Sequence, residues 1–187
     1  MAFFESAEQA WHDAYSTIKR SSSDMGHIGG GNLDGYKTYV AELSKITSAV
    51  QKLPEGFRHL GMVLFAPEPS QKNIEYVNQY LWKQYSVFRK NRLGSLKQAE
   101  RMATLVTLVV KEAQIRVCSK SPNGLTHAQV GQCLNLSNVQ QYNRDWRPDF
   151  ELLTKALLNN GYKALEPITE AVNRVNKNYQ VEQRRVV

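Results

Sequence analysis

The chain has 187 residues, of which 42% are hydrophobic and 22% are charged, a composition typical of a globular protein with a buried core. The most apolar run covers only residues 102–110, between Arg101 and Lys111, which excludes a helix that spans a membrane. The net charge of +7 favours an anionic partner such as nucleic acid, or it only keeps the protein soluble.

Helical spacing of apolar residues begins near the start of the chain. Residues 3–20 and 35–53 each place apolar side chains every three or four positions, which predicts two amphipathic helices. Residues 21–35 are rich in serine and glycine and predict a connecting loop, in which Asp34 caps the second helix. The first residues lack the basic start and the long apolar segment of a signal peptide, so we expect a cytoplasmic protein.

Three further helices are predicted in the middle of the chain. Pro54 suits the first turn of a short helix that ends near the next proline-rich break. Ser70 and Ser95 are good N-caps for two long helices, residues 71–90 and 96–120. The second of these is apolar nearly all round at its centre, which is typical of a helix buried in a bundle.

Positive charge gathers in this middle part. Residues 70–120 hold ten Lys and Arg against three Asp and Glu, whereas residues 1–69 hold six against eight. We therefore expect a basic surface around the turn between the two long helices, where phosphates could bind. The candidate phosphate contacts are Lys83, Arg89, Lys90, Arg92, Lys97 and Arg101.

Aromatic residues alternate with these basic residues. They are Tyr80, Trp82, Tyr85 and Phe88. Aromatic rings among cations can stack on the bases of a single strand, or they can be core residues of the same helix.

Residues 124–147 carry the most informative pattern, a predicted helix-turn-helix. Thr126 can cap a first helix over residues 127–134, and Gly131 is small where the two helices would approach most closely. Asn135 suits the left-handed geometry of the turn, and Ser137 can cap the second helix.

The exposed side of the second helix predicts contacts to DNA bases. Val139, Tyr142 and Trp146 are expected to face the core, which leaves amide and guanidinium groups outside. Amides pair with adenine and guanidinium with guanine in the major groove, whereas an ordinary solvated face more often uses Glu and Lys. The candidate base contacts are Asn138, Gln140, Gln141, Asn143 and Arg144. Gln141 stands where the pattern usually has an apolar residue, which leaves the assignment of base-reading positions open.

The last part of the chain is predicted as two more helices. Pro148 is expected to end the preceding helix, and Asp149 to cap a helix that stops at Gly161. A final helix is expected to begin near Pro167.

The residues that usually carry catalysis or bind metal form no recognisable set. Cys118 and Cys133 form no CxxC pair and fall in apolar helix patterns, so we expect buried free thiols rather than a zinc site or a disulfide. The four histidines are scattered. We therefore expect no catalytic residues, no metal, no cofactor and no enzyme activity.

Two stretches resemble one family of regulators. These are residues 124–146 and the pair "AWHDAYS" and "HIGGG" near the N-terminus, which together are similar to phage late-gene antitermination proteins of the Q type. The resemblance implies a protein of the bacterial host cytoplasm that binds DNA near a late promoter and then loads onto paused RNA polymerase. The zinc-binding version of that family is not expected, because its cysteines are absent here.

The sequence thus predicts an all-α protein, a helical bundle of about seven helices with a C-terminal helix-turn-helix. Residues 1–69 and 70–187 form two parts of it or one single domain. The expected function is a sequence-specific, double-stranded-DNA-binding transcription regulator, most concretely an antiterminator with RNA polymerase as a further partner and no membrane association. Two alternatives stay open, a helical protein-interaction module (an inhibitor or adaptor of a host protein) and a binder of single-stranded nucleic acid or RNA. The oligomeric state is left open.

Overall fold

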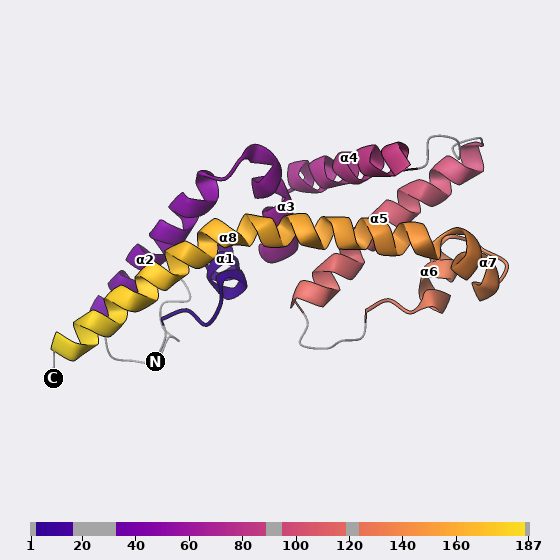
Figure 1. Cartoon of the computed structure of the whole chain (residues 1–187). Coiled ribbons are helices and arrows are strands. Elements are labelled where there is room, and N and C mark those ends of the chain that lie inside the picture. The colour runs from indigo at the N-terminus through magenta and orange to yellow at the C-terminus, as the bar shows by residue number, and fades with distance from the viewer. Residues whose placement is uncertain (1–2, 17–32, 89–94, 119–123, 186–187) are drawn as a thin grey trace.

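The computed structural model describes residues 3–16, 33–88, 95–118 and 124–185, which form eight α-helices and no strand (Figure 1). The all-α prediction is therefore confirmed. In chain order the helices are α1 (Ala7–Ser16), α2 (Leu33–Gln51), α3 (Glu55–Phe65), α4 (Gln71–Phe88), α5 (Leu96–Cys118), α6 (His127–Cys133), α7 (Val139–Asp145) and α8 (Arg147–Arg185). None of the helices described is long and apolar enough to cross a membrane.

Helix α8 runs along the whole molecule. Its 39 residues extend about 58 Å at 1.5 Å per residue. It packs against α1, α2, α3, α4, α5 and α7. Figure 1 shows α6 and α7 at one end of α8, near the end of α4 and the beginning of α5, and α1 and α2 beside its other half.

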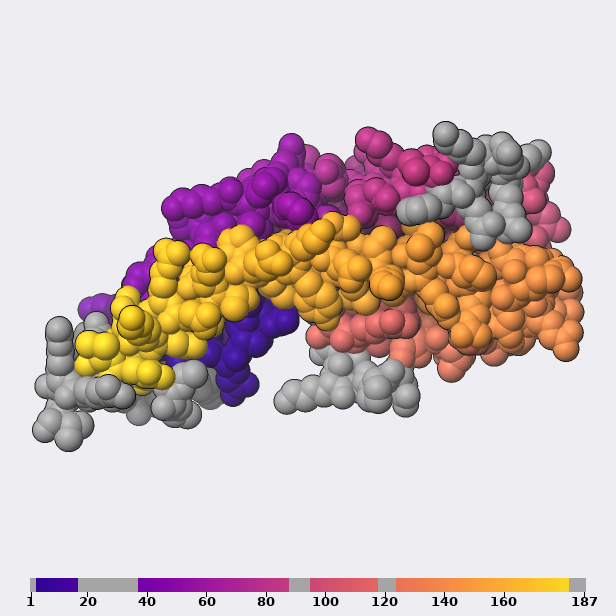
Figure 2. Space-filling model, in the orientation of Figure 1, coloured from indigo at the N-terminus to yellow at the C-terminus, as the bar shows by residue number. Residues whose placement is uncertain are grey.

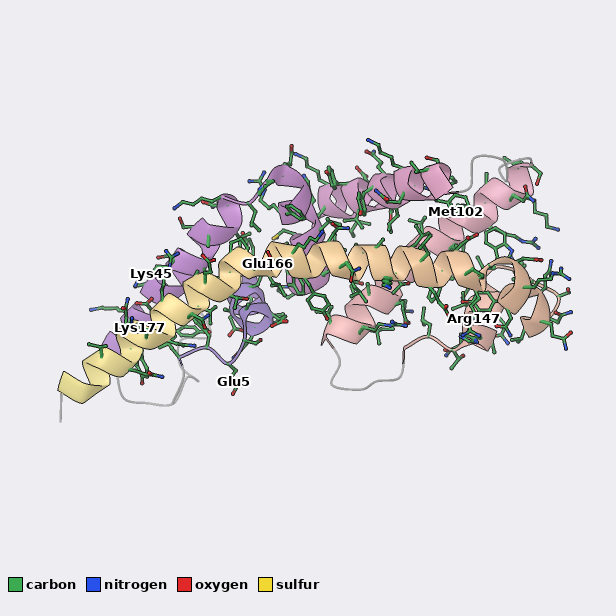
Figure 3. All side chains as sticks on the ribbon, viewed as in Figure 1. Glu5, Lys45, Met102, Arg147, Glu166 and Lys177 are labelled. Atoms are coloured by element: carbon green, nitrogen blue, oxygen red, sulfur yellow. The ribbon has the colours of Figure 1, made fainter. Side chains whose placement is uncertain are left out.

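The predicted break in the last part of the chain is wrong, because α8 is continuous through Gly161 and Pro167. Gly161 is buried where α8 crosses α3, and a Cβ atom there would overlap the side chain of Leu64. The glycine therefore permits a close approach of two helices and does not end one. Pro167 removes one backbone hydrogen bond from the helix, and α8 changes direction near Glu166 (Figure 3).

The beginnings of the long helices follow local capping chemistry. The predicted caps of α4 and α5 are confirmed, because the N–H groups of Asn73 and Gln98 each donate to the serine hydroxyl three positions earlier, at 3.3 Å. Two other predicted boundaries are wrong. Helix α2 begins at Leu33, so Asp34 lies inside it, and Pro148 and Asp149 lie in the first turn of α8.

One continuous core joins the described parts of the chain. It extends from Phe4, before α1, to Val175 in the second half of α8. The central residues of α5 are buried as predicted, with Met102, Leu105 and Val109 almost completely inaccessible to solvent. In the space-filling view the molecule is elongated, and a hollow separates α1 from the far end of α5 (Figure 2).

Candidate nucleic-acid interface

Helix α6 begins with a reciprocal capping arrangement. The Thr126 hydroxyl oxygen accepts from the N–H of Gln129 at 3.3 Å, and the Gln129 side-chain oxygen accepts from the N–H of Thr126 at 2.8 Å. Two backbone donors at the helix start are thereby satisfied. The predicted cap at Thr126 is confirmed.

The chain then reverses at Asn135, whose φ of 50° is the one positive value among the non-glycine residues described. The N–H of Asn135 donates to the carbonyl of Gln132 at 2.9 Å, and the N–H of Leu136 donates to the carbonyl of Gly131 at 3.1 Å. These bonds satisfy the last carbonyls of α6, as in other left-handed helix ends. The left-handed turn predicted at Asn135 is confirmed.

Gly131 lies at the contact between α6 and α7, as expected. It is buried, and a Cβ atom built there would lie 3.5 Å from the Cβ of Tyr142. That distance is an ordinary van der Waals contact, so a methyl group fits at this position. Only a larger side chain would collide with Tyr142.

The start of α7 differs from the prediction by one residue. Asn138, not Ser137, is the N-cap, because its side-chain oxygen accepts from the N–H of Gln141 at 2.8 Å. The Ser137 hydroxyl instead donates to the side-chain oxygen of Gln141 at 3.1 Å. Two of the five predicted base contacts, Asn138 and Gln141, therefore have side chains that hold the start of the helix.

Gln141 is also not on the outer face of α7. Its side chain is half-buried and lines a cavity of about 310 Å³ between α7, α5 and the start of α8. Gln98 and Arg101 of α5 line the same cavity. The position expected for an apolar residue is thus occupied by an amide that faces inward.

The outer face of α7 carries the other three candidates. Gln140, Asn143 and Arg144 are exposed, whereas Tyr142 and Trp146 are buried as predicted. Val139 was expected to face the core, but 40% of its surface is exposed. The Asn138 cap places Val139 in the first turn of α7, at the edge of the outer face.

Arg144 is held by its neighbour. Its Nε and Nη2 atoms donate to the two carboxylate oxygens of Asp145 at 2.8 and 2.9 Å. These hydrogen bonds, together with the charge of Asp145, raise the pKa of Arg144 above its usual value. The Arg144 side chain is 77% exposed, so a ligand can reach it.

Tyr142 anchors α7 to the core. Its ring is completely buried, with its centroid 5.6 Å from that of His127 and 6.5 Å from that of Phe150. Burial raises the pKa of Tyr142 to about 12, assisted by the charge of Glu151 and opposed by that of Arg147. Its hydroxyl group has no hydrogen-bond partner among the residues described.

The predicted phosphate contacts have different environments. Lys83 on α4 and Lys97 in the first turn of α5 are exposed. Arg101 is half-buried, because its Nε donates to the carbonyl of Leu134 at 3.0 Å and its Nη2 to the carbonyl of Asn135 at 2.9 Å. Arg89, Lys90 and Arg92 lie outside the residues described.

Glu112 has a role that the sequence analysis missed. This residue of α5 is only 2% exposed, and its carboxylate accepts from the N–H of Leu125 and the Nε of Arg116, both at 2.6 Å. A single acid in the apolar half of a buried helix was the signal that could have identified it.

The aromatic residues of α4 contribute mainly to the core. Tyr85 is buried, Trp82 packs against the core, and the Tyr80 hydroxyl accepts from the amide nitrogen of Asn160 at 2.8 Å. The side chain of Phe88 lies outside the part of the chain described. These contacts bear out the interpretation of Tyr80, Trp82 and Tyr85 as core residues.

The described residues contain no cluster of three or more metal-ligating side chains. Cys133 was expected to be buried but is exposed on α6. The side chain of Cys118 lies outside the described part.

No known protein family matches the chain, and no match was found among the curated proteins or the solved structures. The resemblance to Q-type antiterminators therefore stays a prediction.

Proposed function

We propose that this protein is a sequence-specific regulator of transcription that places α7 in the major groove of duplex DNA. The observation that carries the proposal is the compact unit of α6, the Asn135 turn and α7, with Gln140, Asn143 and Arg144 together on its outer face. A helix fits in the major groove, which is about 12 Å wide. In a helix-turn-helix of this kind, α7 would be the second helix, which is the one that contacts bases.

The exposed groups of α7 have the chemistry of base recognition. The amides of Gln140 and Asn143 suit adenine, and the guanidinium of Arg144 suits guanine. Arg144 would exchange Asp145 for a base, and an exposed ion pair of this kind is only weakly stabilising. Asn138 and Gln141 are left out of this set, because their side chains hold the start of α7.

Lys97 and Lys83 would bind phosphates beside the groove. Both are exposed, and Figure 1 shows the end of α4 and the beginning of α5 near α6 and α7. Contacts to phosphate position a protein on DNA without reading its sequence, and they make the affinity strongly dependent on salt. Arg89, Lys90 and Arg92 of the intervening segment are the further candidates from the sequence.

The core positions of the α4 aromatic residues favour duplex DNA over a single strand. Of the four aromatic residues proposed for stacking, Tyr80, Trp82 and Tyr85 make core contacts instead. Stacking on single-stranded bases requires accessible ring faces. A competition between duplex and single-stranded DNA of equal sequence should therefore favour the duplex.

The experiment that tests the proposal is a selection of duplexes from a random library, followed by affinity measurements over a salt series. Arg144→Ala should relax the preference at one base pair, at a cost of about 1–3 kcal/mol. The matched control is Arg174→Ala, since Arg174 is also 77% exposed and pairs with a neighbouring acid, Glu170, but lies on the distant part of α8. It should leave the preference unchanged.

Two outcomes would contradict base reading by α7. The first is equal preference of the wild type and a Gln140→Ala/Arg144→Ala double variant for the selected duplex. The second is an affinity without salt dependence, which would favour the protein-interaction alternative. Antitermination, the more specific role implied by the resemblance, requires increased read-through of a terminator by bacterial RNA polymerase in a reconstituted reaction.

A further inference from the structure

We propose that Arg101 and Glu112 are positioning residues, which attach the α6–α7 unit to α5 by holding the two ends of α6. Arg101 then acts through the backbone of the turn and does not contact phosphate. The effect on DNA binding rests on the proposed function, whereas the attachment itself does not.

The two residues lie on the same side of α5. They are eleven positions apart, which is close to three full helical turns and about 16 Å along the axis. Each forms hydrogen bonds to backbone atoms of the chain that leads into or out of α6. One helix face thus holds both ends of α6, with an anion at the first end and a cation at the second.

Arg101 binds the second end of α6. The carbonyls of Leu134 and Asn135 follow the last turn of that helix, where carbonyl groups lack partners within the helix and carry partial negative charge. The planar guanidinium reaches both carbonyls at once, at 3.0 and 2.9 Å. A lysine has the same charge but no rigid pair of donors, so it cannot reproduce this arrangement.

Glu112 binds the first end. Its buried carboxylate accepts from the N–H of Leu125, directly before the Thr126 cap, and Arg116 balances its charge. The chain passes so close that a Cβ atom on Gly124 would overlap the carboxylate. The chain before α6 therefore lies directly against this side chain.

The attachment also fixes where α7 lies relative to Lys97. Lys97 is one turn before Arg101 on the same side of α5, and its side chain is exposed. A residue that contacts phosphate and the residues that read bases would thus belong to one rigid assembly. Groups held in this way bind without an ordering cost, which raises affinity for the one duplex they fit.

The attachment is tested in the free protein by hydrogen exchange. The amides of Leu134 to Leu136 should exchange about tenfold faster in Arg101→Ala and in Arg101→Lys, because the turn opens once the two charge-assisted bonds are lost. Glu112→Gln, which keeps an acceptor oxygen, should accelerate exchange at Leu125 and leave the turn unaffected. Lys97→Ala should change neither region. Unchanged exchange in both Arg101 variants would overturn the proposal.

The consequence for DNA is tested with a duplex selected by the wild type and with a scrambled duplex of the same composition. Arg101→Ala and Arg101→Lys should both lose about tenfold or more in affinity for the selected duplex, with the salt dependence of Arg101→Lys unchanged. Lys97→Ala should instead weaken both duplexes alike and reduce the slope of log affinity against log salt by about one.

These measurements separate the two roles of a cation near DNA. Two results would show that Arg101 contacts phosphate and would overturn the positioning role. The first is an Arg101→Lys variant with wild-type affinity for the selected duplex. The second is an Arg101→Ala variant whose slope of log affinity against log salt is reduced by one while its turn amides exchange no faster. If the wild type shows no preference for any duplex, the proposed function fails. Hydrogen exchange then decides alone whether Arg101 and Glu112 hold the unit.

Discussion

The hydroxyl group of Tyr142 is buried beside α6 and α8 without a hydrogen-bond partner among the residues described. A buried polar group without a partner costs roughly 1–3 kcal/mol of stability. We expect Tyr142→Phe to raise the free energy of unfolding by about 1 kcal/mol, because the ring packing is retained. Denaturant titration of both proteins measures this, and a loss of stability in the variant would mean that the hydroxyl is hydrogen-bonded.

The same residue predicts a dependence of stability on alkaline pH. The folded protein holds the phenol proton with a pKa of about 12, whereas an unfolded tyrosine titrates near 10. Between these values the unfolded chain loses the proton first, so stability should fall by about 2 kcal/mol as pH rises from 10 to 12. Below pH 10 this residue contributes no pH dependence. The stability of the Tyr142→Phe variant, measured by urea titration, should fall less than that of the wild type between pH 10 and 12. Equal pH dependence of the two proteins would contradict the raised pKa of Tyr142.

Two buried glycines in helices give opposite predictions for the same substitution. A Cβ atom on Gly61 of α3 would overlap the ring of Trp11, whereas one on Gly131 of α6 would make an ordinary contact with Tyr142. Gly61→Ala should therefore lower the free energy of unfolding by about 1–3 kcal/mol, since the buried ring of Trp11 cannot move freely. Gly131→Ala should be neutral or stabilise by up to about 1 kcal/mol, because alanine favours helix. Thermal unfolding of both variants measures the difference, and a stable Gly61→Ala variant would contradict the close contact.

Individual helices differ in how well the sequence predicts them. The starts of α4 and α5 were predictable, because the hydroxyls of Ser70 and Ser95 act within a few residues. The continuity of α8 was not, because Gly161 and Pro167 are local helix-breaking signals that packing against distant helices overrides. The N-cap of α7 was predicted one residue too early. Ser137 and Asn138 are both suitable N-cap residues, and only the fold determines which of them caps the helix.

The candidate site shows the same division between local and distant causes. Thr126 and Asn135 were predicted correctly from local chemistry alone. The backbone contacts of Arg101 and Glu112 join residues 13 to 34 positions apart, which no local pattern indicates. A sequence pattern therefore identifies the α6–α7 unit but not what holds it in place.

At the scale of the whole molecule, one side chain ties the two ends of the described chain together. The amide oxygen of Asn176 on α8 accepts from the N–H groups of Phe3 and Phe4 at 2.8 and 2.9 Å, and its nitrogen donates to the Phe4 carbonyl at 3.0 Å. Phe4 is buried, so these bonds hold a core residue in place. We expect Asn176→Ala to destabilise by roughly 2 to 3 kcal/mol.

The comparison variant for this tie is Asn176→Asp. It keeps the oxygens that accept from the two N–H groups but loses the donor to the Phe4 carbonyl, so its loss of stability should be smaller than that of Asn176→Ala. Chemical denaturation followed by tryptophan fluorescence measures both. A loss in Asn176→Asp at least as large as that in Asn176→Ala would contradict this expectation.

The arrangement of α8 has a consequence for how the protein is made. Six of the other seven helices described pack against α8, yet all seven precede it in the chain. During synthesis on the ribosome, the parts of these helices that contact α8 therefore stay uncovered until α8 emerges. The native core can close only at that late point, after which long-range contacts form together. Until α8 has been made, the nascent chain therefore exposes apolar surface of the kind that chaperones shield.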